Sequence, residues 1–346
     1  MERLTSVDVC RGLAVICMAL GDIPVLTDVG IMRHIGLLIA APLFLFVAGV
    51  SYELFVISRR ERQKNAMTRN IENFWKAIIL LAITQGIFFL GVLLFPSKFS
   101  IGFNSSIFFV IAMGYLLSIV LPGKWIYQIP IILAPFLIFY LIPQIPLISS
   151  FLYGSPFQLI PLISYFLAGR GVMIFYENIH DFHLENGKIL MVSAFVAASM
   201  PVSFQLLELP LPVTDTRTTI LGFLWLAGVM IFTLSLVSVC SSKIRVFDII
   251  LSPFERIGRI AFSCYYAFYA LELIVFPYLN RTFIIYLDPI IQVIAYYLFI
   301  VLTIIIAANI EKIWRKVGYI FGFEWALRYG SATLTKLTER VFAQKG

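Results

Sequence analysis

The sequence predicts an all-α fold, a polytopic membrane bundle of about ten transmembrane helices. Apolar residues make up 60% of the 346-residue chain and charged residues 13%, and the mean hydropathy is +0.94. Soluble domains carry about 25% charged residues, so a chain of this composition places most of its apolar surface in lipid. The first apolar stretch has no cleavage site of the signal-peptide kind after it, and we expect it to remain as a helix.

Each expected helix is an apolar stretch that approaches the length needed to cross the hydrocarbon core, about 20 residues. In chain order the expected helices cover residues 5–21, 35–58, 73–95, 105–121, 126–142, 158–176, 189–206, 219–239, 258–279 and 287–309. Residues 1–310 are therefore expected to form one bundle. Residues 311–346 are too charged to span, and we expect an interfacial or cytoplasmic amphipathic tail.

The positions of lysine and arginine predict that both termini are cytoplasmic. In this orientation four cationic residues of the 26 fall outside, which leaves 22 on or near the inner side. Cytoplasmic loops are enriched in these residues. The net charge of +7 then belongs to an inner girdle, and nucleic acid is not an expected partner. We expect a multi-pass protein of the cell membrane with lipid as its surroundings, and association into a homo-oligomer stays open.

Charged residues inside membrane helices are costly and are therefore candidates for function. Asp8 and Arg11 are three residues apart, a spacing that predicts an ion pair on one helical face; a phosphate contact by Arg11 is the alternative. Arg170 lies between two glycines near the inner end of the sixth helix, where it either binds a ligand phosphate or reaches the interface with its head group. Glu272, beside tyrosines in the ninth helix, is expected to be hydrogen-bonded.

Asp22 and His34 form the candidate catalytic pair. Asp22 ends the first helix on the outer side, and His34 follows just before the second helix. A carboxylate that orients an imidazole is a general-base arrangement, and two solvated loop residues are the alternative. No metal site is expected, because the four cysteines are scattered and have no metal-ligand spacing.

Five segments resemble motifs of the transmembrane acyltransferase superfamily. Residues 3–15 (RLTSVDVCRGLAV) are similar to the opening of its heparan-α-glucosaminide N-acetyltransferase-like branch. Residues 41–51 and 161–169 resemble two later helix motifs of that branch. Residues 258–265 (GRIAFSCY) and 322–328 (GFEWALR) are similar to two C-terminal motifs of the related YeiB-like proteins, the last one residue shorter than that pattern.

The resemblance implies transfer of an acyl group, acetyl in the first place, from cytosolic acyl-CoA to an acceptor on the extracytoplasmic side. The acceptor would be an amine or a hydroxyl, as on a sugar. Asp22 stands where the family has asparagine or histidine, and His34 is near the catalytic histidine of the heparan branch. An ionised aspartate cannot donate a hydrogen bond to a developing oxyanion as asparagine can. Asp22 would therefore orient His34 or act as a base; the alternative is that this branch has lost the chemistry.

In this reading cytoplasmic cations hold the phosphates of acetyl-CoA or another acyl-CoA. The candidates are Arg11, Arg59, Arg60 and Arg170. The alternative function is a transporter or lipid-handling protein on the same scaffold, with Arg170 and Glu272 along its path. Many transporters consist of two repeated halves, each with an interrupted helix at the corresponding position. The sequence shows no such pair of interrupted helices.

Overall fold

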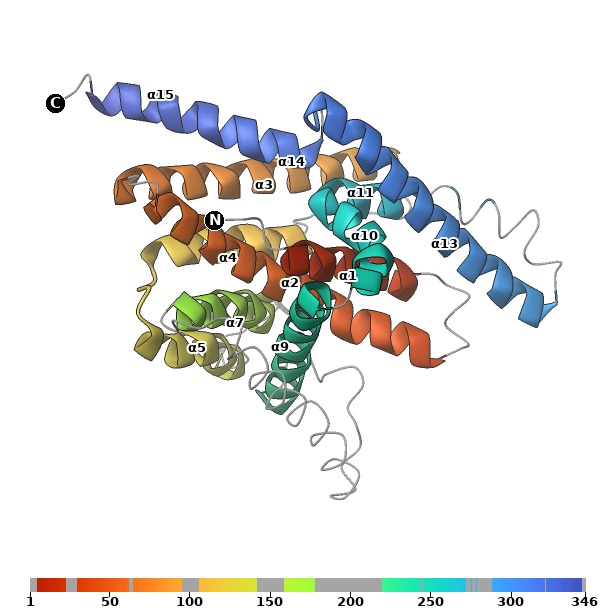
Figure 1. Ribbon diagram of the computed structural model, residues 1–346. Coiled ribbons are helices and arrows are strands. Elements are labelled where there is room, and N and C mark those ends of the chain that lie inside the picture. Colours follow the sequence, from red (N-terminus) through yellow and green to blue (C-terminus); the bar gives the residue numbers. More distant parts are fainter. Residues whose placement is uncertain are drawn as a thin grey trace.

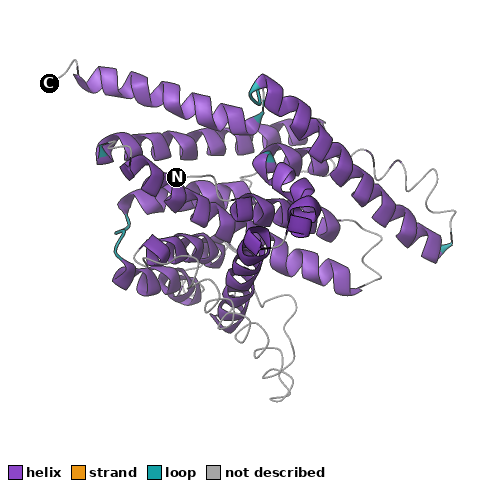
Figure 2. Cartoon of the chain, viewed as in Figure 1, coloured by secondary structure: helices purple, strands orange, loops and turns teal. Residues whose placement is uncertain are grey.

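The computed structural model describes residues 5–22, 30–61, 65–94, 106–141, 159–177, 220–243, 245–271, 275, 278, 288–320 and 322–343. Within these ranges the chain is helical and has no strand (Figure 2), which confirms the all-α prediction. The helix expected at residues 189–206 and the side chain of Glu272 lie outside the described residues.

Eleven helices of ten residues or more carry the architecture in the described ranges (Figure 1). They are α1 (Thr5–Asp22), α2 (Gly30–Glu61), α3 (Ala66–Leu94), α4 (Ile107–Val120), α5 (Gln128–Leu141), α7 (Leu159–Glu177), α9 (Ile220–Lys243), α10 (Arg245–Arg259), α11 (Ala261–Ala270), α13 (Pro289–Trp314) and α15 (Ser331–Ala343). Short helical turns join some of these, namely η2 (Trp125–Tyr127), η6 (Arg315–Val317), α14 (Phe323–Trp325) and η7 (Ala326–Gly330).

Four of the described helices are long and apolar enough to cross a membrane. Their apolar windows are Ile39–Arg60, Ala66–Leu93, Gly222–Cys240 and Tyr297–Val317. Three shorter apolar helices, at Ile107–Val120, Trp125–Phe139 and Ile160–Tyr176, accompany them. The chain is thus a membrane protein by the length and composition of its helices, and the count of ten spans and the orientation stay predictions.

The helix α2 lies at the centre of the bundle, and α3 and α13 lie at its periphery. In the apolar window of α2, 72% of the residues are buried, against 17% in α3 and 17% in α13. Exposed apolar faces on peripheral helices are expected where lipid is the solvent. The interior is aromatic: the ring centroid of Phe108 lies 5.8 Å from that of Phe44 and 4.9 Å from that of Tyr266.

Two helix crossings depend on pairs of glycines that let the backbones touch. Where α2 crosses α7, a Cβ on Gly49 would lie 1.9 Å from the carbonyl oxygen of Phe166, and one on Gly169 would lie 1.9 Å from that of Phe46. Where α1 crosses α10, a Cβ on Gly12 or Gly258 would meet a facing carbonyl oxygen at 1.9 or 1.7 Å. Small residues are the usual means of close helix packing in membranes.

The ninth helix was expected at residues 258–279, whereas α11 begins at Ala261. The backbone leaves helical geometry at Ile260 (φ −119°, ψ 35°), which separates α10 from α11. The helix α10 was not expected from the sequence, because its charged residues, Arg256 and Arg259 among them, break the apolar stretch. The helix is amphipathic, and it packs against α1.

Two further boundaries differ from expectation. The helix α2 begins at Gly30, so the backbone of His34 is helical rather than part of a preceding loop. The helix α13 continues through Glu311, so the expected start of the tail falls inside a helix. Glu311 is fully buried and accepts a hydrogen bond from the Tyr319 hydroxyl at 2.6 Å. Further on, α15 packs along α3, where the Trp75 indole donates to the Thr338 hydroxyl at 3.0 Å.

Candidate functional site

Lysine and arginine side chains gather toward one end of the bundle, here called the basic end. The starts of α1 and α3 meet the ends of α2 and α7 and the segment after α4 there. The cationic residues that a described ion pair places there are Arg11, Arg59, Arg60, Lys76, Arg170 and Arg259.

Arg11 joins three helices at the basic end. Its Nη1 lies 3.0 Å from Asp8 Oδ1 and donates to the carbonyl oxygen of Gly258 at 3.2 Å. Its Nη2 donates to the Ser51 hydroxyl at 2.5 Å. Ser51 in turn donates to the carbonyl oxygen of Val47. The guanidinium therefore holds α1 against both α2 and α10, and its side chain keeps 19% of its surface exposed.

Arg170 is buried in the bundle and binds α2 and the segment that follows α4. Its Nε lies 3.3 Å from Glu53 Oε2, and its Nη2 donates to the carbonyl oxygens of Leu121 and Pro122, both at 3.2 Å. These two carbonyls belong to the segment that directly follows α4, and Arg170 thereby ties that segment to α7. Its Nη1 has no hydrogen-bond partner in the described part of the chain.

Buried carboxylates also anchor Arg59, Arg60 and Lys76. Arg59 Nη2 lies 3.0 Å from Glu72 Oε1, and Lys76 Nζ lies 3.5 Å from the same oxygen. Arg60 Nη2 lies 3.9 Å from Glu53 Oε1, and half of the Arg60 side chain is exposed. Arg60 is thus both connected to the buried Glu53–Arg170 pair and accessible from solvent.

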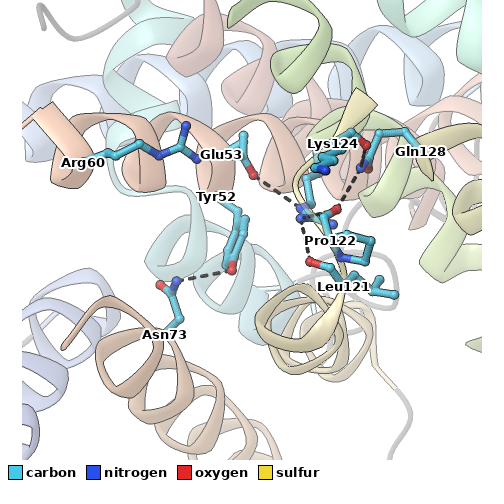
Figure 3. Close-up of polar contacts among 9 residues, drawn as sticks. Tyr52, Glu53, Arg60, Asn73, Leu121, Pro122, Lys124 and Gln128 are labelled. Atoms are coloured by element: carbon cyan, nitrogen blue, oxygen red, sulfur yellow. Dashed lines mark hydrogen bonds and ion pairs between the residues drawn. The ribbon is translucent and has the colours of Figure 1, made fainter. Parts of the chain in front are cut away.

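Further polar atoms around Arg170 are buried without a hydrogen-bond partner among the described residues. They include Asn73 Oδ1 and Gln128 Oε1. The other atom of each amide is used: Asn73 Nδ2 donates to the Tyr52 hydroxyl at 3.3 Å, and Gln128 Nε2 donates to the Pro122 and Lys124 carbonyls, both at 3.0 Å (Figure 3). Buried polar atoms generally have a hydrogen-bond partner, so these two oxygens are available to accept hydrogen bonds from water or a polar ligand.

The candidate catalytic pair belongs to the other end of the same two helices. Asp22 is the last residue of α1, and His34 is in the second turn of α2; the side chains of both lie outside the described part. At a rise of 1.5 Å per residue, Asp22 is roughly 16 Å along α1 from Arg11, and His34 is roughly 37 Å along α2 from Arg59. The two sets of candidates are therefore separated along the bundle.

A second polar cluster, which the sequence analysis did not single out, ties the C-terminal segment to α11. Glu324 accepts hydrogen bonds from the Ser263 backbone N–H at 3.1 Å and from the Ser263 hydroxyl at 2.5 Å. The Phe323 N–H donates to the Ser263 hydroxyl oxygen at 3.2 Å. The carboxylate thus caps the first turn of α11. The signal was present as the two C-terminal segments that resemble family motifs, although nothing in their spacing predicts this contact.

Glu53 is the other functional candidate that the sequence analysis missed. It is 2% exposed and pairs with Arg170 across 117 positions of the chain. Its signal was a lone acid within the apolar stretch of α2. Among the described residues no three His, Cys, Asp or Glu side chains gather where they could hold a metal ion.

These features define a helical membrane protein whose cations gather at one end, around buried carboxylates. A scan against protein-family models and a search of curated proteins find no match to the chain.

Proposed function

We propose that the chain is a membrane-embedded acyltransferase. It would move an acyl group, with acetyl as the first candidate, from acyl-CoA at the basic end to an amine or hydroxyl at the opposite end of α1 and α2. The observation that carries the proposal is the gathering of described cations at one end of helices whose other ends hold Asp22 and His34. An acyl donor with several phosphates needs cations at one end of the helices. An acceptor on the other side of the membrane needs a base at the opposite end.

At the basic end, the arginines proposed to bind the phosphates of acyl-CoA differ in how far they are exposed. Arg60 is half exposed, Arg59 and Arg11 keep about a fifth of their surface, and Arg170 offers its buried Nη1. Hydrogen bonds between arginine and phosphate are charge-assisted and directional. Glu53 and Glu72 hold the guanidinium groups in place before a ligand arrives, which lowers the ordering cost of binding.

At the opposite end, the proposed chemistry needs a base. The acceptor nitrogen or oxygen attacks the thioester carbonyl carbon, the carbon–sulfur bond breaks, and CoA leaves as the thiolate. His34 takes the proton that the acceptor loses, and Asp22 orients the imidazole. A thioester held within the bundle is also kept away from water, which would hydrolyse it.

The five motif-like segments also touch one another, which supports treating them as one unit. Segment 3–15 meets segment 41–51 through Arg11 and Ser51, and meets segment 258–265 through the close approach of Gly258 to α1. Segment 41–51 meets segment 161–169 at the Gly49–Gly169 crossing, and segment 258–265 meets segment 322–328 through Ser263.

The test is binding of acetyl-CoA to the purified chain, measured by calorimetry. A charge-assisted contact contributes about 1.5–3 kcal/mol, so Arg60→Ala should raise the dissociation constant about 10- to 100-fold. Lys336→Ala, an exposed cation on α15, is the matched control and should leave it unchanged. A transporter or lipid-handling protein does not need acyl-CoA, so absence of binding in the folded protein would reject the acyltransferase.

A further inference from the structure

The helices α3 and α15 lie side by side and run in opposite directions (Figure 1). Near the start of α3, the Thr68 hydroxyl donates to Glu339 Oε1 at 2.6 Å. Farther along α3, the Ile79 side chain meets the residue that precedes α15, since a Cβ on Gly330 would lie 2.9 Å from it. The chain of α15 therefore runs back along the first half of α3.

Three residues mark the line along which the two helices meet. They are Thr68 and Trp75 on α3 and Thr338 on α15. The residues directly before these three contact residues are apolar, namely Met67, Phe74 and Leu337. One residue along a helix is a rotation of about 100°. Because the helices are antiparallel, the same step back along each chain brings all three side chains to the same flank of the pair. Val341, one turn after Leu337, extends this set, here called the apolar flank.

The opposite flank of the pair is charged and faces the bundle. The residues directly after the three contact residues are Arg69, Lys76 and Glu339. Lys76 Nζ lies 3.1 Å from the centroid of the Phe55 ring in α2 and 3.5 Å from Glu72 Oε1. The charged flank thus turns toward α2, and the apolar flank turns away from it. In agreement with this arrangement, the four residues of the apolar flank are 43–53% exposed.

The apolar flank continues along α3 toward the far end of that helix. Phe89 is 64% exposed, and it lies within about 60° of Phe74 around the helix axis. The stretch from Met67 to Phe89 rises roughly 33 Å, which is close to the thickness of the hydrocarbon core, about 30 Å. Since α3 is long and apolar enough to cross a membrane, lipid is the expected solvent of this face.

We infer that α15 lies against the membrane, with the apolar flank of α3 and α15 in contact with the acyl chains of lipid. The sequence alone leaves the C-terminal tail either interfacial or cytoplasmic, because the apolar strip of α15 is narrow by itself. The neighbouring face of α3 widens that strip and connects it to a helix able to span. Amphipathic helices commonly bury an apolar face at the boundary of head groups and acyl chains. The inference is independent of the proposed acyl transfer.

The experiment compares two adjacent positions on α15. A bimane fluorophore is attached to Leu337→Cys or to Lys336→Cys, each in the full chain without the four native cysteines and reconstituted in phosphatidylcholine vesicles. Phosphatidylcholine brominated on its acyl chains quenches from within the membrane, and iodide on both sides of the vesicle quenches from water. The Leu337 label should lose fluorescence to the brominated lipid. The Lys336 label is the matched control: it lies about 100° away around the helix and should lose fluorescence to iodide instead.

Quenching of the Leu337 label by iodide and not by brominated lipid would place α15 in water and overturn the inference. Protection of that label from both quenchers would overturn it too, because a protein surface such as a second copy of the chain would then cover the flank. If the cysteine-free chain does not fold, the unaltered chain is labelled by phosphatidylcholine with a diazirine at the end of an acyl chain. Covalent modification should reach Leu337 or Val341 as well as Phe89. Modification of Phe89 without any on α15 would overturn the inference.

Discussion

Arg170 of α7 and Glu53 of α2 form a buried ion pair, with 3.3 Å between Nε and Oε2. The same guanidinium donates to the carbonyl oxygens of Leu121 and Pro122, which directly follow α4. One side chain thus joins three elements at the basic end. A second cation, Arg60, lies 3.9 Å from the other oxygen of Glu53. The carboxylate therefore has two cationic neighbours, whereas the only described carboxylate paired with Arg170 is Glu53.

This asymmetry predicts unequal effects of removing the partners. Removing one member of a buried pair costs about 3–5 kcal/mol, because the other charge is left uncompensated. Glu53→Gln should lower the melting temperature of the purified protein more than Arg170→Met, because Arg60 still compensates Glu53 in the second variant. The Glu53→Leu/Arg170→Met double variant should recover part of the loss. Equal melting temperatures for all four proteins would show that the pair is not formed.

The contrast between two ion pairs shows where sequence information ends. Asp8 and Arg11 are three residues apart in one helix, so helical geometry alone predicts their proximity. Glu53 and Arg170 are 117 residues apart, and their contact depends on how closely α2 and α7 approach. The apolar helices were predictable because their signal is local. The helix α10 was not, because its burial depends on α1, and the start of α2 was misplaced because residues 30–34 carry little hydrophobic signal.

The glycine crossing of α2 and α7 makes a second prediction. Gly169→Ala should destabilise the protein by about 3 kcal/mol, the upper end of ordinary overpacking costs, because the new Cβ meets a backbone carbonyl that cannot move alone. Gly86→Ala in α3 is the control, since nothing lies within 4 Å of a Cβ there. Alanine is the better helix former by about 1 kcal/mol, so this control should keep or raise the melting temperature. A harmless Gly169→Ala would mean that the two helices cross farther apart.

The Ser263–Glu324 contact predicts how the C-terminal segment is held. Glu324→Gln weakens a charge-assisted cap of α11, and loss of such a cap costs about 1 kcal/mol. The amides of α14 and η7 should then exchange hydrogen faster, while those of α2 should stay protected. Glu339→Gln, farther along α15, weakens the hydrogen bond that Glu339 accepts from the Thr68 hydroxyl and should leave the exchange of α14 unchanged. Unaltered exchange in Glu324→Gln would show that the contact does not anchor the segment.

The orientation of the basic end can be tested with two positions on α13. Asp288, the N-cap of α13, and Lys316, just past its end, are both exposed and lie at opposite ends of the helix. In a background without the four native cysteines, Asp288→Cys should react with an impermeant thiol reagent in intact cells, and Lys316→Cys should react only after lysis. This follows from the excess of cations in cytoplasmic segments. The opposite labelling pattern would reverse the proposed sidedness of the chemistry.

The proposed base predicts a kinetic signature. His34→Ala should lower the rate of acyl transfer about 10²- to 10⁴-fold, the usual contribution of a general base. It should leave acetyl-CoA binding unchanged, because the phosphate contacts lie at the basic end. The rate of the unaltered enzyme should rise with pH, because a general base must first lose its own proton. A fully active His34→Ala protein would remove this residue from the mechanism.

Asp22→Asn then distinguishes two roles for the carboxylate. If Asp22 orients the imidazole and stabilises its protonated form, asparagine should lower the rate and shift its rise to lower pH, because the positive charge loses its partner. If the position instead serves a developing oxyanion, asparagine should preserve or raise the rate, because an amide donates a hydrogen bond that a carboxylate cannot. Asp22→Asn should leave the affinity for acetyl-CoA unchanged whichever role is correct. Asp22 is roughly 16 Å along α1 from Arg11, the nearest proposed phosphate contact on that helix.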